Sequence, residues 1–190
     1  MNNLIKALIS IWENDIETKF KQGKLVYERQ LQADLYHLLK YKLSNEFDIW
    51  VEPVIYMKDS ILHLTKPDLI ITKGLNIIGV IELKFKPWEY TKYEGDIMKL
   101  NAFQDEAIKG NKIWLGTLPV SPNWSKQNKE ANHLYFNLSK DLLKSFVVFT
   151  HPESDALNLK HYNKISNFLL LRGFIKDGKN IVFNHNFFSD

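Results

Sequence analysis

Residues 67–85 read PDLIITKGLNIIGVIELKF, and this stretch decides the fold. Its two apolar runs, 68–72 and 77–85, flank the tetrapeptide KGLN at 73–76, which is typical of a turn. The sequence therefore predicts a β-hairpin. Apolar residues occupy both parities of the second run, as in a strand that is covered on both faces, so we expect it to be central in the sheet. One predicted face holds Ile77, Ile81, Leu83 and Phe85, and the other holds Ile78 and Val80.

Three charged residues lie at the open end of this hairpin. Glu82 and Lys84 stand two residues apart, so a strand directs both side chains to the same face. If the turn centres on Leu75, Asp68 lies opposite Glu82, because each is seven residues from that centre. Cβ atoms in this relation are about 4.5–5.5 Å apart, and two carboxylates so close repel each other unless a cation lies between them. Such oxygen ligands suit Mg²⁺, for which Mn²⁺ can substitute.

The chain before the hairpin predicts two helices and a strand. Residues 3–21 are amphipathic, and Gly23 separates them from a second helix at 25–43. Residues 48–57 are strand-like, but Pro53 interrupts them and indicates an edge strand or a bulge.

The chain after the hairpin predicts further helices and strands. We expect a helix at 95–109, a strand at 112–118, a polar loop at 119–130, a helix at 132–144, a strand at 145–150, a helix at 155–171 and a hairpin at Asp177-Gly178. This order predicts an α/β fold with a mixed central sheet flanked by helices.

Polar residues fall on the apolar side of two of these helices. Glu28 shares a face with the leucines of helix 25–43, and a carboxylate on a buried stripe is unusual without a partner. On helix 95–109, Asp96 and Gln104 lie within the apolar arc and Lys99 lies at its margin. We expect that these side chains can line the same pocket as the three charged residues of the hairpin.

The composition is that of a folded domain. The chain has 190 residues, of which 45% are hydrophobic, and these values suit one packed domain over 1–190. No run reaches the roughly 18 apolar residues that span a bilayer, and the N-terminus does not resemble a signal peptide, so we expect a cytoplasmic protein with no membrane partner. The absence of cysteine excludes disulfides and thiolate metal sites. A net charge of +3 is weak support for a nucleic-acid partner.

Pro67-Asp68, followed after thirteen residues by Glu82-Leu83-Lys84, resembles the motif of the PD-(D/E)XK nuclease superfamily, to which restriction endonucleases belong. The resemblance covers about residues 25–118. It implies a restriction-endonuclease-like core of one helix, a three-stranded meander, a crossover helix and a fourth strand. The N-terminal helix and a C-terminal α/β extension lie outside it.

The resemblance implies a role for each matching residue. Asp68 and Glu82 would be metal ligands, assisted by Glu28 on the first core helix, and Lys84 would be the catalytic lysine. Gln104, or Lys99, would be the polar residue of the crossover helix that supports the site. The implied function is a Mg²⁺-dependent deoxyribonuclease, with endonuclease action favoured and a homodimer among the compatible assemblies.

Each of these residues also has a purely structural explanation. Asp68 can cap a turn, and Glu82 with Lys84 can form a solvated ion pair. Glu28 and Asp96 can be carboxylates that favour the start of a helix. Lys99 is more often a solvated lysine.

Two other functions therefore stay open: a nucleic-acid-binding module of the same fold without the chemistry, and a subunit that engages another protein. Two segments that mix aromatic residues with lysines are further candidates for substrate contacts. One is residues 88–93, which follow the proposed site directly, and the other is the loop with Trp124, Lys126 and Lys129.

Overall fold

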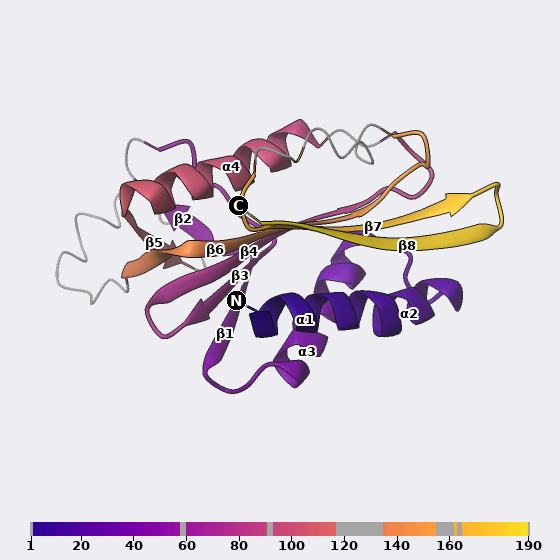
Figure 1. The fold of residues 1–190 in the computed structure, drawn as a ribbon, viewed down its shortest axis with the longest axis horizontal. Helices are drawn as coiled ribbons and strands as arrows, with labels where there is room; N and C mark the ends of the chain where they lie inside the picture. Colours follow the sequence, from indigo (N-terminus) through magenta and orange to yellow (C-terminus); the bar gives the residue numbers. More distant parts are fainter. Residues whose placement is uncertain are drawn as a thin grey trace.

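The predicted hairpin lies in the middle of one mixed sheet of eight strands with helices on both faces, as Figure 1 shows. This computed structural model describes residues 2–57, 60–90, 93–116, 135–154, 162 and 165–189. The elements in chain order are α1 (Asn2–Ser10), the π-helix η1 (Ile11–Ile16), α2 (Glu17–Lys21), α3 (Glu28–Lys42), β1 (Phe47–Val51), β2 (Val54–Tyr56), β3 (Leu69–Lys73), β4 (Asn76–Phe85), α4 (Glu94–Lys109), β5 (Lys112–Gly116), β6 (Tyr135–Phe149), β7 (Phe168–Lys176) and β8 (Asn180–Phe188). The predicted α/β class is confirmed.

The strand order is β1-β3-β4-β6-β5-β2, and β7 and β8 continue the sheet from β6. β4 pairs with β3 in antiparallel and with β6 in parallel orientation, which confirms its central position. β1 and β2 follow each other in the chain but lie at opposite ends of this path. The break between them falls at Glu52, whose φ is 46°, and Pro53, which confirms the predicted interruption.

The hairpin has a shorter turn than predicted. Lys73 pairs with Asn76, so the turn is the dipeptide Gly74-Leu75 rather than a loop centred on Leu75. A bulge at Ile78 then shifts the register by one residue, and Leu69 faces Ile81. Asp68 therefore lies next to Glu82 in the register, as predicted. This register results from a two-residue turn followed by a bulge, and not from a longer turn.

The bulge also changes which face two side chains occupy. Ile77 packs with Val80 on the α4 side of the sheet, and Ile78 packs on the opposite side, against the cluster that contains Ile81. The predicted faces of Ile77 and Ile78 were wrong, because one extra residue in a strand reverses the alternation of the side chains.

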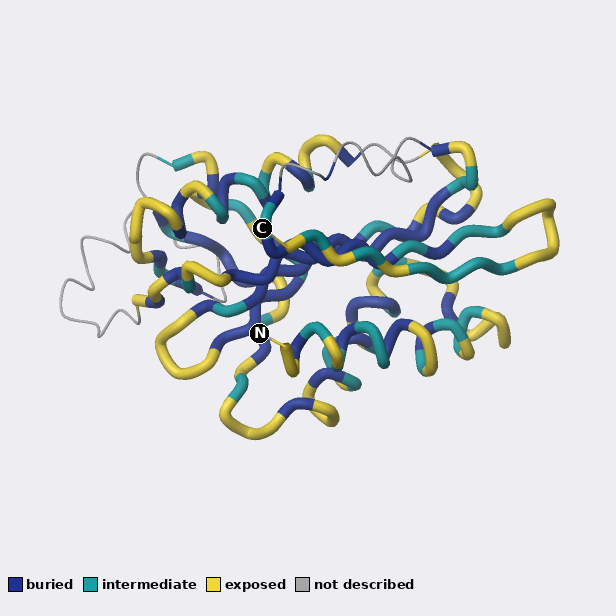
Figure 2. Tube along the Cα trace, in the orientation of Figure 1, coloured by how far each residue is buried: buried dark blue, intermediate teal, exposed yellow. Residues whose placement is uncertain are grey.

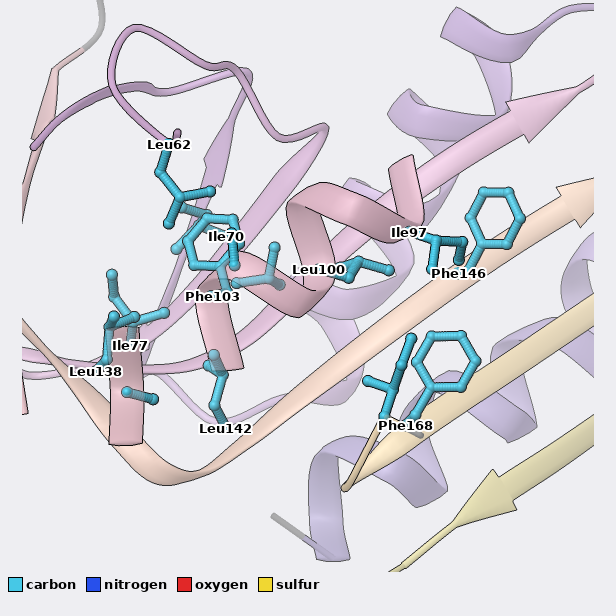
Figure 3. Close-up of a cluster of buried hydrophobic side chains, with 14 of the residues drawn as sticks. Leu62, Ile70, Ile77, Ile97, Leu100, Phe103, Leu138, Leu142, Phe146 and Phe168 are labelled. Carbon is cyan, nitrogen blue, oxygen red and sulfur yellow. The ribbon is translucent and has the colours of Figure 1, made fainter. Parts of the chain in front are cut away.

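Two hydrophobic cores cover the two faces of the sheet, and the inner strands are accordingly buried in Figure 2. Figure 3 shows the core under α4, which includes Ile70, Leu100, Phe103 and Phe146. The opposite core lies between the sheet and the N-terminal helices and includes Leu8, Trp12, Leu31, Ile71 and Phe149. None of the helices that the structure describes is long and apolar enough to cross a membrane.

Two predicted helices are wrong where the structure describes them. Residues 135–144, predicted within a helix at 132–144, belong to β6, and residues 168–171, predicted within a helix at 155–171, begin β7. Residues 155–161 and 163–164 of the second helix and the predicted loop at 119–130 lie outside the described residues. Apolar spacing in short runs fits either structure, and here pairing with β4 and β6 overrides it.

The strand next to β4 also differs from the prediction. We expected residues 112–118 to supply the fourth strand of the core, but β5 pairs with β6 and β2. The parallel neighbour of β4 is the second half of β6, residues 143–149. The hairpin predicted at Asp177-Gly178 is confirmed, because β7 and β8 pair on either side of it and both residues have positive φ values, 53° and 68°.

Candidate active site

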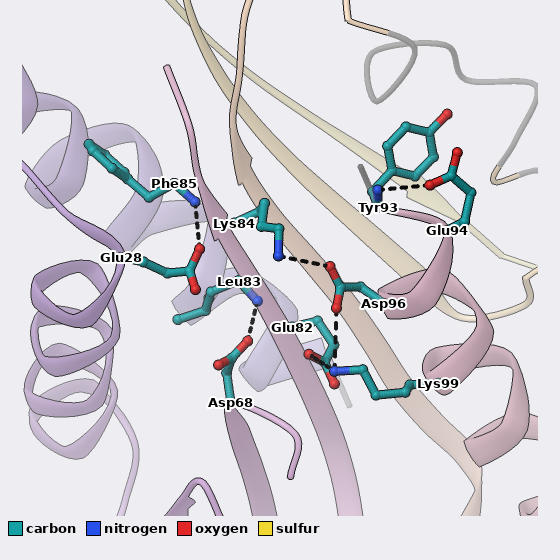
Figure 4. A network of polar contacts seen from close by, with 10 residues as sticks. All are labelled: Glu28, Asp68, Glu82, Leu83, Lys84, Phe85, Tyr93, Glu94, Asp96 and Lys99. Atoms are coloured by element: carbon teal, nitrogen blue, oxygen red, sulfur yellow. Dashed lines mark hydrogen bonds and ion pairs between the residues drawn. The ribbon is translucent and has the colours of Figure 1, made fainter. Parts of the chain in front are cut away.

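The predicted acidic residues lie close together at the point where β3 stops pairing with β4. The β3–β4 ladder ends with Leu69 opposite Ile81, so the next N–H groups on that edge of β4 need other acceptors. The N–H of Leu83 donates to Asp68 Oδ2 at 2.7 Å, and the N–H of Phe85 donates to Glu28 Oε2 at 2.9 Å, as Figure 4 shows. Two carboxylates thus replace the missing strand.

Gln32, on α3, fixes the main chain at Asp68. Its Nε2 donates to the main-chain oxygen of Asp68 at 3.2 Å, and its side chain is buried on the apolar face that α3 turns to the sheet. The leucines predicted to share this face, Leu31, Leu35 and Leu39, are buried as well. Glu28 opens the same helix, so the packing of α3 brings its carboxylate to the end of β4.

Glu82 and Lys84 point from β4 towards α4, which confirms that they share a face (Figure 4). Glu82 Oε2 accepts a hydrogen bond from Lys99 Nζ at 2.6 Å. Asp96 completes the network, because its carboxylate lies 3.3 Å from Lys99 Nζ and 3.6 Å from Lys84 Nζ. Glu82 is therefore not the solvated strand end that the structural explanation required, whereas Lys84 is partly exposed and forms an ion pair with Asp96.

The carboxylate of Glu82 is held away from water, and that of Asp68 is partly buried. Glu82 is 2% exposed, and its Oε1 is buried with no hydrogen-bond partner among the described residues. Burial raises the pKa of Glu82 to about 8, and the charge of Asp68 adds to this rise while Lys99 opposes it. Burial also raises the pKa of Asp68 to about 6, with a further contribution from Glu28. Near pH 7, full ionisation of Glu82 therefore needs an additional cation close to its carboxylate.

The donor set fits a hard divalent cation, although the side chains do not form a complete cage. In the described part of the chain, no group of three or more His, Asp or Glu side chains is arranged to hold a metal ion. Lys99 occupies one oxygen of Glu82, and Oε1 is the oxygen that lacks a partner. Asp68 and Glu82 are the residues whose chemistry suits Mg²⁺ or Mn²⁺, ions that retain several waters and need few protein carboxylates.

The structure brings together four of the five predicted site residues, Glu28, Asp68, Glu82 and Lys84, at the end of β4. The fifth, Gln104, has another partner: its Oε1 accepts hydrogen bonds from the N–H and the Oγ of Ser166, both at 3.1 Å. Gln104 lies eight residues beyond Asp96 on α4, roughly 12 Å along the helix axis.

Asp96 and Lys99 are the two network residues that sequence reasoning weighed as structural or solvated. The sequence did indicate that these two side chains face the site, because both lie in or beside the apolar arc of α4. What the pattern did not reveal is that the side chain of Lys99 reaches the buried carboxylate of Glu82.

Comparisons with protein-family models, with curated proteins and with solved structures find no significant match to this chain, so the proposals below rest on the geometry of the site and on the motif.

Proposed function

We propose that this protein is a Mg²⁺-dependent nuclease on a restriction-endonuclease-like core, with DNA as the favoured substrate and endonuclease cleavage as the favoured action. The observation that carries the proposal is the buried carboxylate of Glu82. One of its oxygens lacks a partner among the described residues, Asp68 lies close enough to raise its pKa, and Lys84 stands on the same face of β4. A buried acid with a second carboxylate close by and a cationic side chain on the same face is a frequent arrangement in catalytic sites.

The topology adds support. The elements α3, β1, β3, β4 and α4 are followed by β6, which pairs with β4 in parallel. This order supports the proposed core, because the motif implies a helix, a three-stranded meander, a helix and a fourth strand; in the proposal β6 takes the place expected for residues 112–118. The structural inserts β2 and β5 extend the far edge of the sheet, beyond β6.

In the proposed reaction a water oxygen attacks phosphorus, the bond from phosphorus to the leaving oxygen breaks, and the leaving oxygen takes up a proton. Asp68 and Glu82, with Glu28 beside them, would hold the metal ion, which when bound polarises the phosphoryl oxygen and acidifies water. Lys84 positions the attacking water and stabilises negative charge on the phosphate. The ion pair of Lys84 with Asp96 is long, at 3.6 Å, so the lysine can turn towards a phosphate at small cost.

The test is a cleavage assay with plasmid, linear duplex DNA, single-stranded DNA and RNA, each with Mg²⁺, with Mn²⁺ and with EDTA. We expect cleavage that requires the metal and is lost in Asp68→Asn. Asp48→Asn is the matched control, because Asp48 is an exposed aspartate on β1 with its own lysine partner. Metal-dependent cleavage that survives in Asp68→Asn, or its absence on all four substrates, would refute the proposal.

A nucleic-acid-binding module without the chemistry is the second candidate, and the ion pair of Lys99 with Glu82 favours it. A lysine that permanently neutralises Glu82 would leave no place for a metal ion. Titration with Mn²⁺ separates the two candidates: the nuclease binds Mn²⁺ with an affinity that falls in Glu82→Gln, whereas the binding module shows no Glu82-dependent uptake.

A further inference from the structure

A pocket opens next to the end of β4, beyond the carboxylates. It has a volume of about 560 Å³, within the range of about 300–1,000 Å³ that is usual for small-ligand sites. It lies between α2, the start of α3, the segment after β4 and the β7–β8 hairpin. Its lining includes Phe20, Tyr27, Glu28, Phe85, Lys86 and Trp88.

Two aromatic rings of this pocket are exposed and have no partner in the described part of the chain. Trp88 is 71% exposed and Tyr27 is 57% exposed. Neither side chain makes a ring contact or a hydrogen bond with another described residue. An exposed aromatic residue is not unusual by itself, but two beside one cavity form an apolar surface of the kind that marks ligand or partner sites.

The pocket adjoins the proposed active site at Glu28. This residue lines the pocket, and its carboxylate accepts the hydrogen bond from the N–H of Phe85 at the end of β4. Lys86, also in the lining, stands two residues beyond Lys84, roughly 7 Å away at about 3.3 Å per residue. Lys84 itself points to the α4 side of the sheet, so the nucleotide placed in this pocket is one that passes the end of β4 beside Glu28.

The charges of the pocket favour a base over a phosphate as its occupant. Lys86 is already paired with Glu89 at 2.8 Å, and Glu28 adds a further negative charge. The pocket thus has no surplus cation, and what it offers is apolar volume and two flat rings. Nucleobases stack on exposed Trp and Tyr rings largely irrespective of sequence.

We propose that this pocket holds an unstacked nucleobase, so that the protein acts on nucleic acid that is single-stranded at the nucleotide next to the cleaved bond. The identity of the bound strand rests on the proposed nuclease function. A base within a duplex is covered by its neighbours and must first be extruded, so a strand that is already unpaired reaches the rings of Trp88 and Tyr27 more easily.

The test is fluorescence anisotropy with a labelled single strand and with the duplex of the same sequence, in EDTA so that no cleavage occurs. We expect Trp88→Ala to weaken binding of the single strand by about 5- to 100-fold, with a smaller effect on the duplex, and Tyr27→Ala to act in the same direction. The matched control is Tyr41→Ala, because Tyr41 is 87% exposed but lies near the other end of α3. A thermal melt of each variant shows whether it is folded.

The outcomes separate this proposal from the proposed nuclease. If Trp88→Ala binds the single strand as the unchanged protein does, or if the duplex loses as much affinity, the base pocket is refuted, even where metal-dependent cleavage persists. If neither nucleic acid binds, the pocket proposal also fails and the exposed rings instead indicate a protein partner. A Trp88-dependent preference for single strands in a protein that cleaves nothing would support the pocket and refute the nuclease.

Discussion

The two halves of β4 are stabilised in different ways. Up to Ile81 the strand has β3 on one side and β6 on the other, and the buried side chains of this half are aliphatic. From Glu82 onward β3 is absent, two carboxylates bind the free N–H groups, and a buried acid and a lysine point towards α4. The first half is a packed strand, and the second half concentrates charge inside the protein.

This difference shows why a site can form at this place. Buried charge destabilises a fold, so it is tolerated only where a rigid neighbouring segment fixes the surrounding groups. The first half of β4 supplies that segment. We expect substitutions in the first half to lower stability, and substitutions in the second half to alter chemistry and the response to pH.

The largest expected effect is on stability in the first half. Ile77→Ala should lower the free energy of unfolding by about 2–5 kcal/mol, because it removes a fully buried side chain from the core under α4. Ile78→Ala, across the bulge, should lower it less, because Ile78 is only partly buried. Denaturant titration of both variants measures the difference. Equal losses would argue against the bulge that places the two residues on opposite faces.

In the second half, Lys84→Met should slow metal-dependent cleavage by roughly 10²–10³-fold while the free energy of unfolding changes little. The reason is that Lys84, within the described part of the chain, makes only a long ion pair but faces the same side as Glu82. Lys73→Met serves as the control, since Lys73 lies at the other end of the hairpin and pairs with Glu46 at 3.1 Å. Similar rates for the two variants in the same assay would remove Lys84 from the mechanism.

The pH dependence of stability is expected to come from the second half. Because the pKa values of Glu82 and Asp68 are raised to about 8 and about 6, the folded protein binds more protons than the unfolded chain between their ordinary and their raised values. The free energy of unfolding of the metal-free protein should therefore fall as pH rises from about 4 to 8, by up to about 1.4 kcal/mol per pH unit for each group.

Glu82→Gln should flatten this slope above pH 6, where Glu82 accounts for most of it. Glu46→Gln is the control, because Glu46 is an exposed glutamate in the turn before β1 and forms an ion pair with Lys73. Chemical denaturation at several pH values in EDTA measures the slopes. A slope in Glu82→Gln as steep as that of the unchanged protein would show that Glu82 is not held protonated by burial.

The smallest expected effect concerns Gln104, which lies outside the network. Gln104→Ala should lower the free energy of unfolding by about 0.5–1.5 kcal/mol through the loss of its bonds to Ser166, and the cleavage rate per folded molecule should not change. Rate and stability are measured on the same preparation. A loss of activity comparable to that of Lys84→Met would return Gln104 to the active site.

The sequence by itself determined the hairpin, the central place of residues 77–85 and the shared face of Glu82 and Lys84. These features depend on short-range periodicity and on the chemistry of a tight turn, both of which are local. The position of Asp68 beside the end of β4 was also predicted, although a bulge at Ile78, which no local pattern indicated, was needed to produce the register.

Only the tertiary structure decided which distant segments complete the sheet and the site. Residues 135–144 belong to a strand beside β4 despite a spacing that also suits a helix, because the centre of the sheet offers both backbone partners and two apolar faces, whereas residues 145–149 were correctly predicted as a strand. The pairing of Lys99 with Glu82 and the pocket under Trp88 arise in the same way, from the packing of α4 and of the N-terminal helices on β4. Contacts between residues far apart in the chain are set by this packing and override local propensity.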